Sequence, residues 1–531
     1  MQALKIAAIA VVALAIAVGF VRTFASLPSL EGRARSAMLT DTADTTLGRA
    51  VAPRVAAHPG RSGVHELRTG HGAFAARVLL ARAAERSLDL QYYIWHKDLA
   101  GTLLFEELRA AADRGVRVRL LLDDNVTAGL DLTLAALDRH PNIEVRLYNP
   151  FVIRKLRIVG YATDFVRLNR RMHNKSFTAD NQVTIVGGRN VGDAYFGAGD
   201  GLLFADLDVL AVGPVVARVS RQFDLYWSSL SAYPANRILS RMDPREIERI
   251  AVTATRIARS SAGRRYVAAV RDSPVFAALA EQRLPLEWAA TRLVHDHPAK
   301  TLGRADPGQL LVTRLKALLG EPDCALALVS GYFVPTDGGV YALKTMARQG
   351  VRVRILTNAL EATDVFIVHA GYADKRTALL ESGIELFEMR GPAQGDSPDR
   401  AITGKGSGSG SGSAAGTAIG GSATALHAKT FSVDRSRTFI GSFNFDPRSA
   451  KLNTELGVVI DSPMLAARID DSFRDIIPAN SYKVEIDGNG KLYWLEKRDG
   501  KLVRHNTEPG TTFMQRTLIG LLSLLPIDWL L

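Results

Sequence analysis

One pattern of eighteen residues occurs twice in this chain, from His173 to Asn190 and from His427 to Asn444. The two copies read HNKSFTADNQVTIVGGRN and HAKTFSVDRSRTFIGSFN. Both follow one template, which is His, any residue, Lys, four residues, Asp, six residues, Gly, Gly or Ser, any residue, Asn. A five-point pattern that recurs at identical spacing indicates a duplicated structural unit, with one copy of the motif in each unit.

The residue types in the template suit chemistry at a phosphodiester. Imidazole can attack phosphorus and, with an ordinary pKa of about 6.5, can also carry a proton at neutral pH. One His cannot do both jobs in one step. Two copies supply a nucleophile and a general acid, and the acid becomes the base of the second half-reaction. His173 and His427 are therefore the predicted catalytic pair.

The other motif positions supply donors and backbone freedom. Ammonium and amide groups can stabilise charge on non-bridging phosphoryl oxygens, and glycine lets the backbone approach a phosphate closely. The runs VTIVGG and TFIGS look like buried strands ending in a turn, which would bring Asn back beside His. The predicted donors are Lys175, Lys429, Asn190 and Asn444, and the predicted glycines are Gly187, Gly188 and Gly441.

Together the two copies resemble the paired HKD motifs of the phospholipase D superfamily. The stretches LQYYIW, GVRVRLLLDDN, RLNRRMHNKSF, GGRNVGDAYFG and GSFNFDPRSAKLNTE extend the resemblance to bacterial cardiolipin synthases of the C type, from about Leu67 to the C terminus. The resemblance implies phosphatidyl transfer through a covalent phosphohistidine, with no metal and no other cofactor. By analogy His173 attacks a phospholipid phosphorus, and His427 then deprotonates the glycerol hydroxyl of phosphatidylglycerol. The expected donor is phosphatidylethanolamine, with a second phosphatidylglycerol as the alternative.

Four carboxylates accompany the two motifs. Asp180 and Asp434 belong to the template; in the superfamily such residues look like scaffold near the motif turn, and a direct chemical role is the alternative. Each catalytic His also needs an acceptor for its second ring proton. Glu455 matches the family pattern for that acceptor. Asp206 is the weaker match, because it follows the motif Asn by 16 residues rather than 11.

The net charge of +12 predicts a polyanionic partner, either nucleic acid or an anionic membrane surface. A nuclease of the superfamily and a hydrolytic phospholipase D are the alternative functions. Nucleases that resemble this motif commonly carry one copy and dimerise, whereas both copies lie in one chain here. A catalytically dead lipid-binding module would require a broken motif, and both are intact. The expected partner is therefore an anionic phospholipid membrane with phosphatidylglycerol, phosphatidylethanolamine and cardiolipin, without nucleic acid; an accessory protein is a further alternative.

Residues 1–24 are predicted to be a membrane anchor or a signal segment. An apolar run of sixteen residues extends from Ile6 to Val21, between Lys5 and Arg22. This is shorter than the roughly 20 residues of a spanning helix, although snorkelling of the flanking charges extends its reach. An uncleaved anchor in the bacterial inner (cytoplasmic) membrane is favoured, and a cleaved signal peptide is the alternative. The membrane side of the catalytic units stays open.

The length of 531 residues predicts two core units. LDLQYYIW, LAGTLLFEELRAAADRG and VRVRLLLDDN read as strand, helix and strand, and ALALVSGYFVP, GGVYALKTMARQG and VRVRILTN repeat that order. The predicted fold class is α/β, because this order favours parallel strands. We expect two similar phospholipase D-type units with mixed β-sheets flanked by helices, related by a pseudo-two-fold axis, with both motifs at a shared cleft.

The remaining regions divide the chain further. The single cysteine, Cys324, lies in an apolar run and is expected to be buried in a strand. The final helical segment either packs on the core or lies on a membrane surface. A basic cluster either binds anionic headgroups or is a solvated face; it comprises Arg154, Lys155, Arg157, Arg167, Arg170 and Arg171. The predicted divisions are a tether at 25–61, a first unit at 62–233, a helical connection at 234–308, a second unit at 309–480 with a flexible Gly/Ser-rich insertion at 404–422, and a small β appendage with an amphipathic helix at 481–531.

Overall fold

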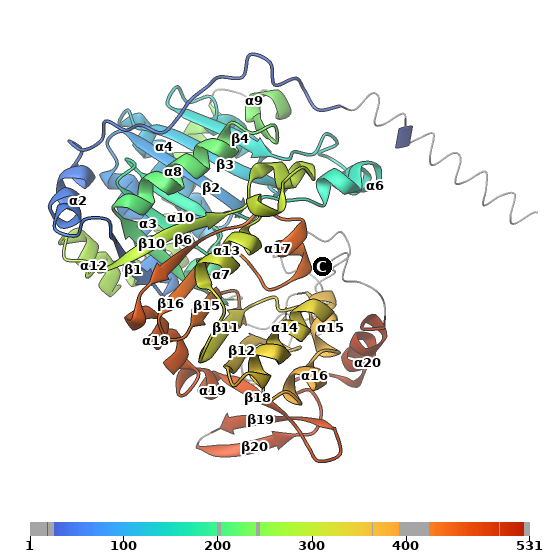
Figure 1. Ribbon diagram of the computed structural model, residues 1–531. Coiled ribbons are helices and arrows are strands. Elements are labelled where there is room, and N and C mark those ends of the chain that lie inside the picture. Colours follow the sequence, from blue (N-terminus) through green and yellow to red (C-terminus); the bar gives the residue numbers. More distant parts are fainter. Residues whose placement is uncertain are drawn as a thin grey trace, which may run out of the picture.

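The computed structural model describes residues 18–19, 26–198, 203–240, 245–363, 365–391, 424–498 and 500–524. Within these residues 18 strands pair into one mixed sheet with helices packed around it (Figure 1). The predicted membrane segment, apart from Val18 and Gly19, and the Gly/Ser-rich insertion lie outside the described residues. None of the helices in the described part of the chain has the length and apolarity needed to cross a membrane.

The first half of the sheet contains eight strands. They are β1 (Ser62–Leu67), β2 (Ser87–Ile94), β3 (Arg117–Val126), β4 (Ile143–Tyr148), β5 (Ser176–Ala179), β6 (Val183–Gly187), β8 (Asp208–Val212) and β9 (Ala232–Pro234). Their order across the sheet is β9-β4-β3-β2-β5-β6-β8-β1. β2, β3 and β4 are parallel, and the other neighbours are antiparallel.

The second half repeats this order. Its strands are β10 (Glu287–His295), β11 (Ala325–Ser330), β12 (Arg352–Asn358), β13 (Glu385–Met389), β15 (Lys429–Val433), β16 (Arg437–Gly441), β17 (Leu456–Asp461), β18 (Ser481–Ile486), β19 (Leu492–Arg498) and β20 (Lys501–His505). From β18 to β10 the order is β18-β13-β12-β11-β15-β16-β17-β10, and β11, β12 and β13 are parallel. The antiparallel pair β1 and β10 joins the two halves into one sheet.

Helices follow the parallel strands in both halves, as the sequence predicts. In the first half they are α3 (Gly70–Ala83), α4 (Leu99–Asp113), α5 (Asp131–Leu137), α6 (Arg157–Leu168), α7 (Asp193–Phe196) and α8 (Pro214–Trp227). In the second half they are α13 (Leu311–Leu319), α14 (Asp337–Arg348), α15 (Phe366–Ala373), α16 (Arg376–Leu380), α17 (Pro447–Lys451), α18 (Pro463–Ser472) and α19 (Ile476–Asn480). The side chains of Asp98 and Thr336 cap α4 and α14, and left-handed Gly115 and Gly350 follow their ends. The predicted strand, helix, strand order of each unit is confirmed.

The predicted helical connection at 234–308 is wrong for its second part. It does contain the helices α9 (Ala235–Ile238), α10 (Glu246–Arg259), α11 (Ser261–Arg271) and α12 (Pro274–Ala280). It also contains β10, which occupies in the second half the place that β1 occupies in the first, so that half of the sheet begins at Glu287 rather than at 309. The strand was missed because it is only partly buried, and its sequence EWAATRLVH lacks a clean apolar alternation.

The predicted tether at 25–61 is packed against the first unit over its described residues. It contains helix α2 (Thr46–Ala56), which Thr45 caps. The guanidinium of Arg33 donates to the carbonyl oxygens of Ser229 and Ala232 at 2.7 Å each. Arg146 donates to the carbonyl oxygen of Ala34 in turn. These long-range contacts fix the segment on the surface, and the lack of periodicity in its sequence gave no sign of them.

The C-terminal strands extend the main sheet instead of forming a separate appendage, because β18 pairs with β13. The last described helix, α20 (Phe513–Leu522), packs Ile519 into a cluster with residues of α15. Cys324 is exposed, which contradicts the predicted burial. It precedes β11 by one residue, so its backbone, rather than its side chain, joins the folded core.

Both motif aspartates lie at hairpin turns. The carboxylate of Asp180, between β5 and β6, accepts hydrogen bonds from the backbone N–H groups of residues 85, 86 and 87 at 2.8 to 3.0 Å. Asp434, between β15 and β16, accepts from the N–H groups of residues 323, 324 and 325 at 2.7 to 3.2 Å. Each carboxylate therefore ties a motif hairpin to the start of the neighbouring strand, β2 or β11. This geometry fits the scaffold interpretation.

We expect Asp180→Asn and Asp434→Asn each to lower the free energy of unfolding by about 1–3 kcal/mol, because an amide turns a donor toward backbone donors. Thermal or denaturant unfolding measures the change. Glu321→Gln is the control, since its carboxylate is largely exposed. Unchanged stability of both Asp variants would contradict the structural role.

Candidate active site

Each motif folds as a hairpin that returns to its starting edge. His173 precedes β5 and Asn190 follows β6. Both therefore lie at the end of the hairpin opposite the turn at Asp180. His427 and Asn444 flank β15 and β16 in the same way. The predicted return of Asn toward His is confirmed as a two-stranded hairpin.

The two imidazoles are oriented by carboxylates from opposite units. Nδ1 of His173 lies 2.9 Å from Oε2 of Glu455, and Nδ1 of His427 lies 2.5 Å from Oδ2 of Asp206. Both carboxylates are buried. Their paired geometry agrees with the predicted orienting roles, but the exchange between units was not predicted. Because Nδ1 serves the carboxylate, Nε2 is the ring nitrogen available for chemistry.

Backbone pairing between the units produces this exchange. The N–H of His173 donates to the carbonyl of Thr454, and the N–H of His427 donates to the carbonyl of Ala205, both at 2.8 Å. In each case the acceptor immediately precedes the orienting carboxylate. The longer spacing before Asp206 includes β7 (Leu203–Ala205), which pairs in parallel with β14 (Thr424–Leu426).

The Gly-or-Ser position of the template lies against the orienting carboxylate of its own unit. The length of that carboxylate explains which of the two residues occurs there. A Cβ atom at Gly188 would lie 2.2 Å from Oδ1 of Asp206, so no side chain fits there. At the equivalent position Ser442 donates its hydroxyl to Glu455, and its carbonyl lies 3.1 Å from Nδ1 of His173. We expected these glycines to admit phosphate. In the structure Gly188 instead makes room for the carboxylate.

The glycines that precede this position are also crowded by protein atoms. A Cβ atom at Gly187 would lie 2.5 Å from the Cα of Asp208. At Gly441 it would lie 2.5 Å from the carbonyl oxygen of Leu456. Both glycines therefore permit close approach of the neighbouring strand.

The predicted lysines line the same centre. The ammonium of Lys175 donates to the carbonyl of His173 at 2.6 Å, and Lys429 donates to the carbonyl of His427. The side chains of both lysines and both histidines are buried. Nδ1 of His173 lies 3.1 Å from the carbonyl oxygen of Ser442, which belongs to the second motif, so the two motifs converge.

The two asparagines differ. The amide of Asn190 accepts from the N–H of Ile94 at 3.2 Å and donates to the hydroxyl of Tyr195 at 3.1 Å, so it secures the end of β2. Oδ1 of Asn444 is buried without a hydrogen-bond partner among the described residues. The nitrogen of Asn190, which is the atom that would donate to a phosphoryl oxygen, donates to Tyr195 instead. The donor role of both asparagines stays a prediction.

Two tyrosines complete the centre and were not predicted. The ring of Tyr93 contacts His173 edge-on at a centroid distance of 5.1 Å, and Tyr195 contacts His427 edge-on at 5.2 Å. Both tyrosines come from the first unit. They lie in LQYYIW and GGRNVGDAYFG, which carry the family resemblance, but no spacing rule connects them to the histidines.

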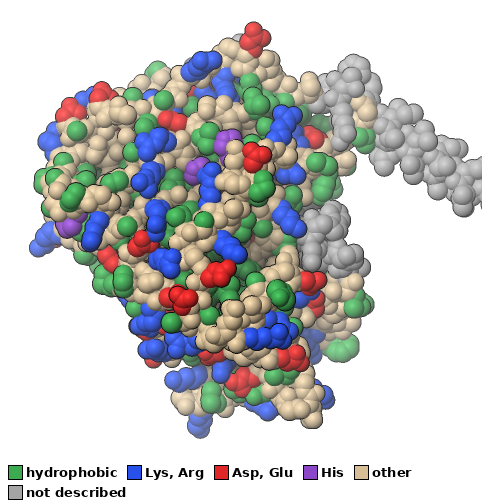
Figure 2. Space-filling view, in the orientation of Figure 1, with side chains coloured by type: hydrophobic (Ala, Val, Ile, Leu, Met, Phe, Trp, Pro, Cys, Tyr) green, Lys and Arg blue, Asp and Glu red, His purple; other side chains and the backbone are tan. Residues whose placement is uncertain are grey.

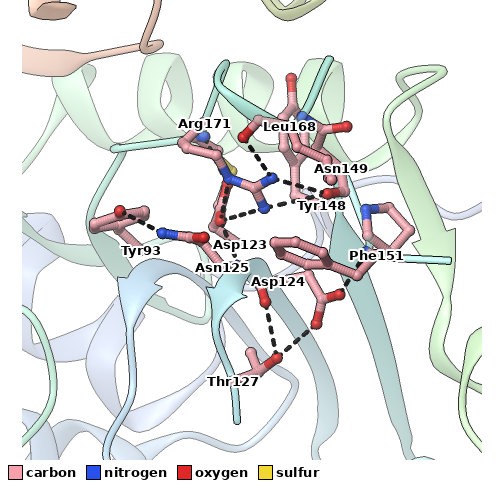
Figure 3. A network of polar contacts seen from close by, with 12 residues as sticks. Tyr93, Asp123, Asp124, Asn125, Thr127, Tyr148, Asn149, Phe151, Leu168 and Arg171 are labelled. Carbon is pink, nitrogen blue, oxygen red and sulfur yellow. Dashed lines mark hydrogen bonds and ion pairs between the residues drawn. The ribbon is translucent and has the colours of Figure 1, made fainter. Parts of the chain in front are cut away.

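A polar network holds the approach to His173 (Figure 3). The guanidinium of Arg171 points toward Asp123, with a shortest distance of 2.7 Å, and the other oxygen of Asp123 accepts from the N–H of Met172. The amide of Asn125 donates to the hydroxyl of Tyr93 at 3.0 Å. The network therefore fixes both the residue before His173 and the ring beside it.

Most of the predicted basic cluster is engaged inside the protein. Arg154 pairs with Asp124 and Asp131 at 2.5 Å each, and Arg171 is fully buried. Neither a headgroup site nor a solvated face describes these arginines. Three other members make internal contacts as well. Arg157 donates to the carbonyls of Asp124 and Asn125, Arg167 pairs with Asp164, and Arg170 donates to the carbonyl of Lys300. Lys155 is exposed.

Burial and nearby charges shift the pKa values of the two His–carboxylate pairs in different directions. Burial, helped by the lysine charges, lowers the pKa of His173 well below its ordinary value and lowers the pKa of His427 to about 3. Burial raises the pKa of Glu455 to about 7, against the opposing charge of Lys175. Burial alone would also raise the pKa of Asp206, but His427 and the nearby cations hold it below the ordinary value. Both imidazoles are therefore neutral at pH 7 in the empty site.

We expect His427 to lower the free energy of unfolding as the pH decreases from 7 to 4.5, while Glu455, whose pKa is raised to about 7, acts in the opposite direction. Unfolded His427 binds a proton near pH 6.5, whereas the folded side chain resists protonation until about pH 3. The unfolded state therefore binds more protons in this range. Denaturant unfolding across the range should show a weaker decrease for His427→Gln, whereas the partly exposed His140→Gln control should follow the wild type. Parallel curves for wild type and His427→Gln would contradict the assignment.

Comparison with known proteins agrees with this geometry. The family described as "Cardiolipin synthase, PLD-like domain" matches residues 79–227 and 315–477. The chain is 48% identical to cardiolipin synthase C of Escherichia coli (strain K12) over 487 residues, which cover 91% of this chain and 99% of that protein. It is 24% identical to a cardiolipin synthase of Listeria monocytogenes serotype 4b (strain CLIP80459), with coverage of 81% and 72%.

A solved structure shows the same fold. The crystal structure of phosphatidylserine synthase from Haemophilus influenzae Rd KW20 matches with a TM-score of 0.56 at 14% identity, and covers 91% of this chain and 98% of its own. Because the identity is low, this match supports the fold alone. The family match and the 48% identical relative together show that the chain belongs to the phospholipase D superfamily and, within it, to the cardiolipin synthase family.

Proposed function

We propose that the chain is a phosphatidyltransferase of the cardiolipin synthase C type, which transfers a phosphatidyl group to phosphatidylglycerol through a phosphohistidine. The main support is the pair of buried imidazoles, each with Nδ1 on a carboxylate of the other unit and with two lysines beside them. We further infer that the two units are related by an approximate two-fold axis through this shared site. The proposed setting is an anionic phospholipid membrane, the bacterial inner membrane, without nucleic acid.

In the first half-reaction Nε2 of His173 attacks the donor phosphorus. The P–N bond forms, the P–O bond to the headgroup breaks, and His427 gives its proton to the departing oxygen. In the second half-reaction neutral His427 takes the proton of a glycerol hydroxyl of phosphatidylglycerol. The resulting oxygen attacks phosphorus, the P–N bond breaks, and cardiolipin is released. With phosphatidylethanolamine as donor, ethanolamine is the first product.

Substrate binding raises the proton affinity of the general acid, which then takes its proton from solvent. Without that effect His427 is neutral at pH 7, because burial and the lysine charges disfavour its protonation. A phosphodiester anion bound between Lys175 and Lys429 offsets those charges and raises the pKa of His427. Ionised Asp206 then stabilises the imidazolium at Nδ1. Protonation of His427 is thereby coupled to the presence of the donor.

Two other functions use the same centre. In a hydrolytic phospholipase D, water would replace phosphatidylglycerol in the second half-reaction and yield phosphatidic acid. A superfamily nuclease would hold a polynucleotide. On the face shown in Figure 2, Lys and Arg side chains are dispersed among acidic and apolar ones, which favours the lipid substrate.

Product analysis tests the transfer. Vesicles of phosphatidylglycerol, with and without phosphatidylethanolamine, are mixed with the full chain and analysed by mass spectrometry. We expect cardiolipin from the intact protein and none from His427→Ala, since the second half-reaction lacks its base. A requirement for phosphatidylethanolamine would identify the donor. Phosphatidic acid without cardiolipin would show hydrolysis, and no lipid product would contradict the proposed function.

The orienting carboxylates give a sharper test of which His does what. We expect Glu455→Gln and Asp206→Asn each to lower kcat by about 10²- to 10⁴-fold on a natural donor. A phosphatidyl ester of 4-nitrophenol needs no proton on its leaving group. Release of 4-nitrophenol in a single turnover should therefore be largely restored in Asp206→Asn but not in Glu455→Gln.

Asp180→Asn, measured at a temperature where it is folded, is the matched carboxylate control for this experiment, because its carboxylate contacts only backbone N–H groups. We expect it to keep the wild-type release of 4-nitrophenol. Rescue of Glu455→Gln instead of Asp206→Asn would reverse the two histidine roles.

A further inference from the structure

Exposed apolar side chains gather in two short segments of this protein. Of the 17 large hydrophobic side chains that are exposed among the described residues, eight lie in residues 156–166 and 513–524. The first segment belongs to α6 and its start, and the second to α20 and its end. The eight residues are Leu156, Ile158, Val166, Phe513, Met514, Leu518, Leu521 and Leu524, and five of them are at least 70% exposed.

Helix α6 lies beside the C-terminal end of β3, which is connected to His173 through side-chain contacts. The hydroxyl of Tyr161 donates to Oδ1 of Asn125 at 2.5 Å, and Arg157 donates to the carbonyl of Asn125 at 2.8 Å. Asn125 in turn donates to Tyr93 (Figure 3), and the ring of Tyr93 contacts His173. The chain of contacts from α6 to the catalytic imidazole therefore has three steps.

Helix α20 lies beside the corresponding edge of the second unit. Its Ile519 is buried in a cluster with Leu360, which follows β12 by two residues. Asn358, the last residue of β12, donates to the carbonyl of Leu426 at 2.9 Å, and Leu426 precedes His427. The two helices thus lie at the ends of β3 and β12, next to the contacts that lead to the two histidines, and both lie at the right-hand side of the molecule in Figure 1.

The charges on both segments suit an anionic surface. In the first segment the exposed cation is Lys155, whereas Arg154 and Arg157 have internal partners and Arg167 pairs with Asp164. Residues 513–524 contain Arg516 and no acidic residue. A helix with an exposed apolar face and basic neighbours is typical of segments that lie in the interface of a bilayer.

We propose that the exposed apolar faces of α6 and α20 dock on an anionic phospholipid bilayer, one on each side of the active-site entrance. This inference rests on the proposed function and adds the surface through which the lipid reaches the centre. The two faces enter the headgroup region together, so that the phosphodiester of a membrane lipid reaches the buried histidines without leaving the bilayer. Tyr161 and Asn125 transmit the position of α6 to the ring of Tyr93.

Site-specific fluorescence tests the surface without relying on catalysis. In the full chain with Cys324→Ser, a single cysteine replaces Ile158 or Leu521 and carries an environment-sensitive dye. Vesicles of phosphatidylglycerol and phosphatidylethanolamine contain a lipid with a spin label near the headgroup. We expect at least a twofold loss of fluorescence at both positions. The matched controls Val252→Cys and Leu502→Cys, which are exposed to a similar extent on α10 and β20, should show no such loss.

Equal quenching at all four positions, or none at Ile158 and Leu521, would overturn the proposal. A dye response that rises with protein concentration in the absence of vesicles would also overturn it, because the surface would then bind a second copy of the chain.

Turnover separates docking from chemistry. Ile158→Asp with Leu521→Asp should lose at least about tenfold on vesicles and keep wild-type turnover on a mixture of monomeric short-chain phosphatidylglycerol and phosphatidylethanolamine. Loss on both substrates alike would contradict a docking role, and an inactive wild type on both would contradict the proposed function alone.

Discussion

The active centre depends on an exchange of carboxylates between two similar units. Glu455 of the second unit orients His173 of the first, and Asp206 of the first orients His427 of the second. A buried carboxylate needs a partner, and a buried imidazole needs an acceptor for Nδ1–H, so each unit satisfies a requirement that the other creates. A single unit would have one imidazole without its acceptor and one carboxylate without its donor. The candidate active site therefore lies at the interface between the units.

The exchange is similar on both sides but not identical. Asp206 is short, and Gly188 leaves room for it; Glu455 is longer, and Ser442 donates to it. The nearby cations keep Asp206 ionised, whereas burial raises the pKa of Glu455 to about 7. In the proposed mechanism His427 becomes an imidazolium, and the carboxylate beside it is the firmly charged one. This difference allows one duplicated motif to supply two chemical roles.

Much of this arrangement could be predicted from the sequence, because local spacing carries it. The duplicated template indicated both histidines and their hairpins, and the repeated GVRVR stretches indicated equivalent parallel strands. The carboxylate exchange was not predictable, because it depends on backbone pairing between Ala205 and His427, which are far apart in the chain. The basic cluster was misinterpreted for the same reason, since the acidic partners of Arg154 and Arg171 lie on and after β3. Strand β10 escaped prediction because its sequence, EWAATRLVH, lacks the apolar alternation typical of a half-buried strand.

The cross-unit pairing can be measured directly by NMR of histidine labelled with ¹⁵N. An Nδ1–H group held by a buried carboxylate gives a proton resonance at unusually low field, and His173→Gln and His427→Gln assign the two signals. The structure predicts that Glu455→Gln removes the low-field signal of His173 and keeps that of His427, and that Asp206→Asn does the reverse. If each substitution instead affected the imidazole of its own unit, or neither signal changed, the exchange between units would be contradicted.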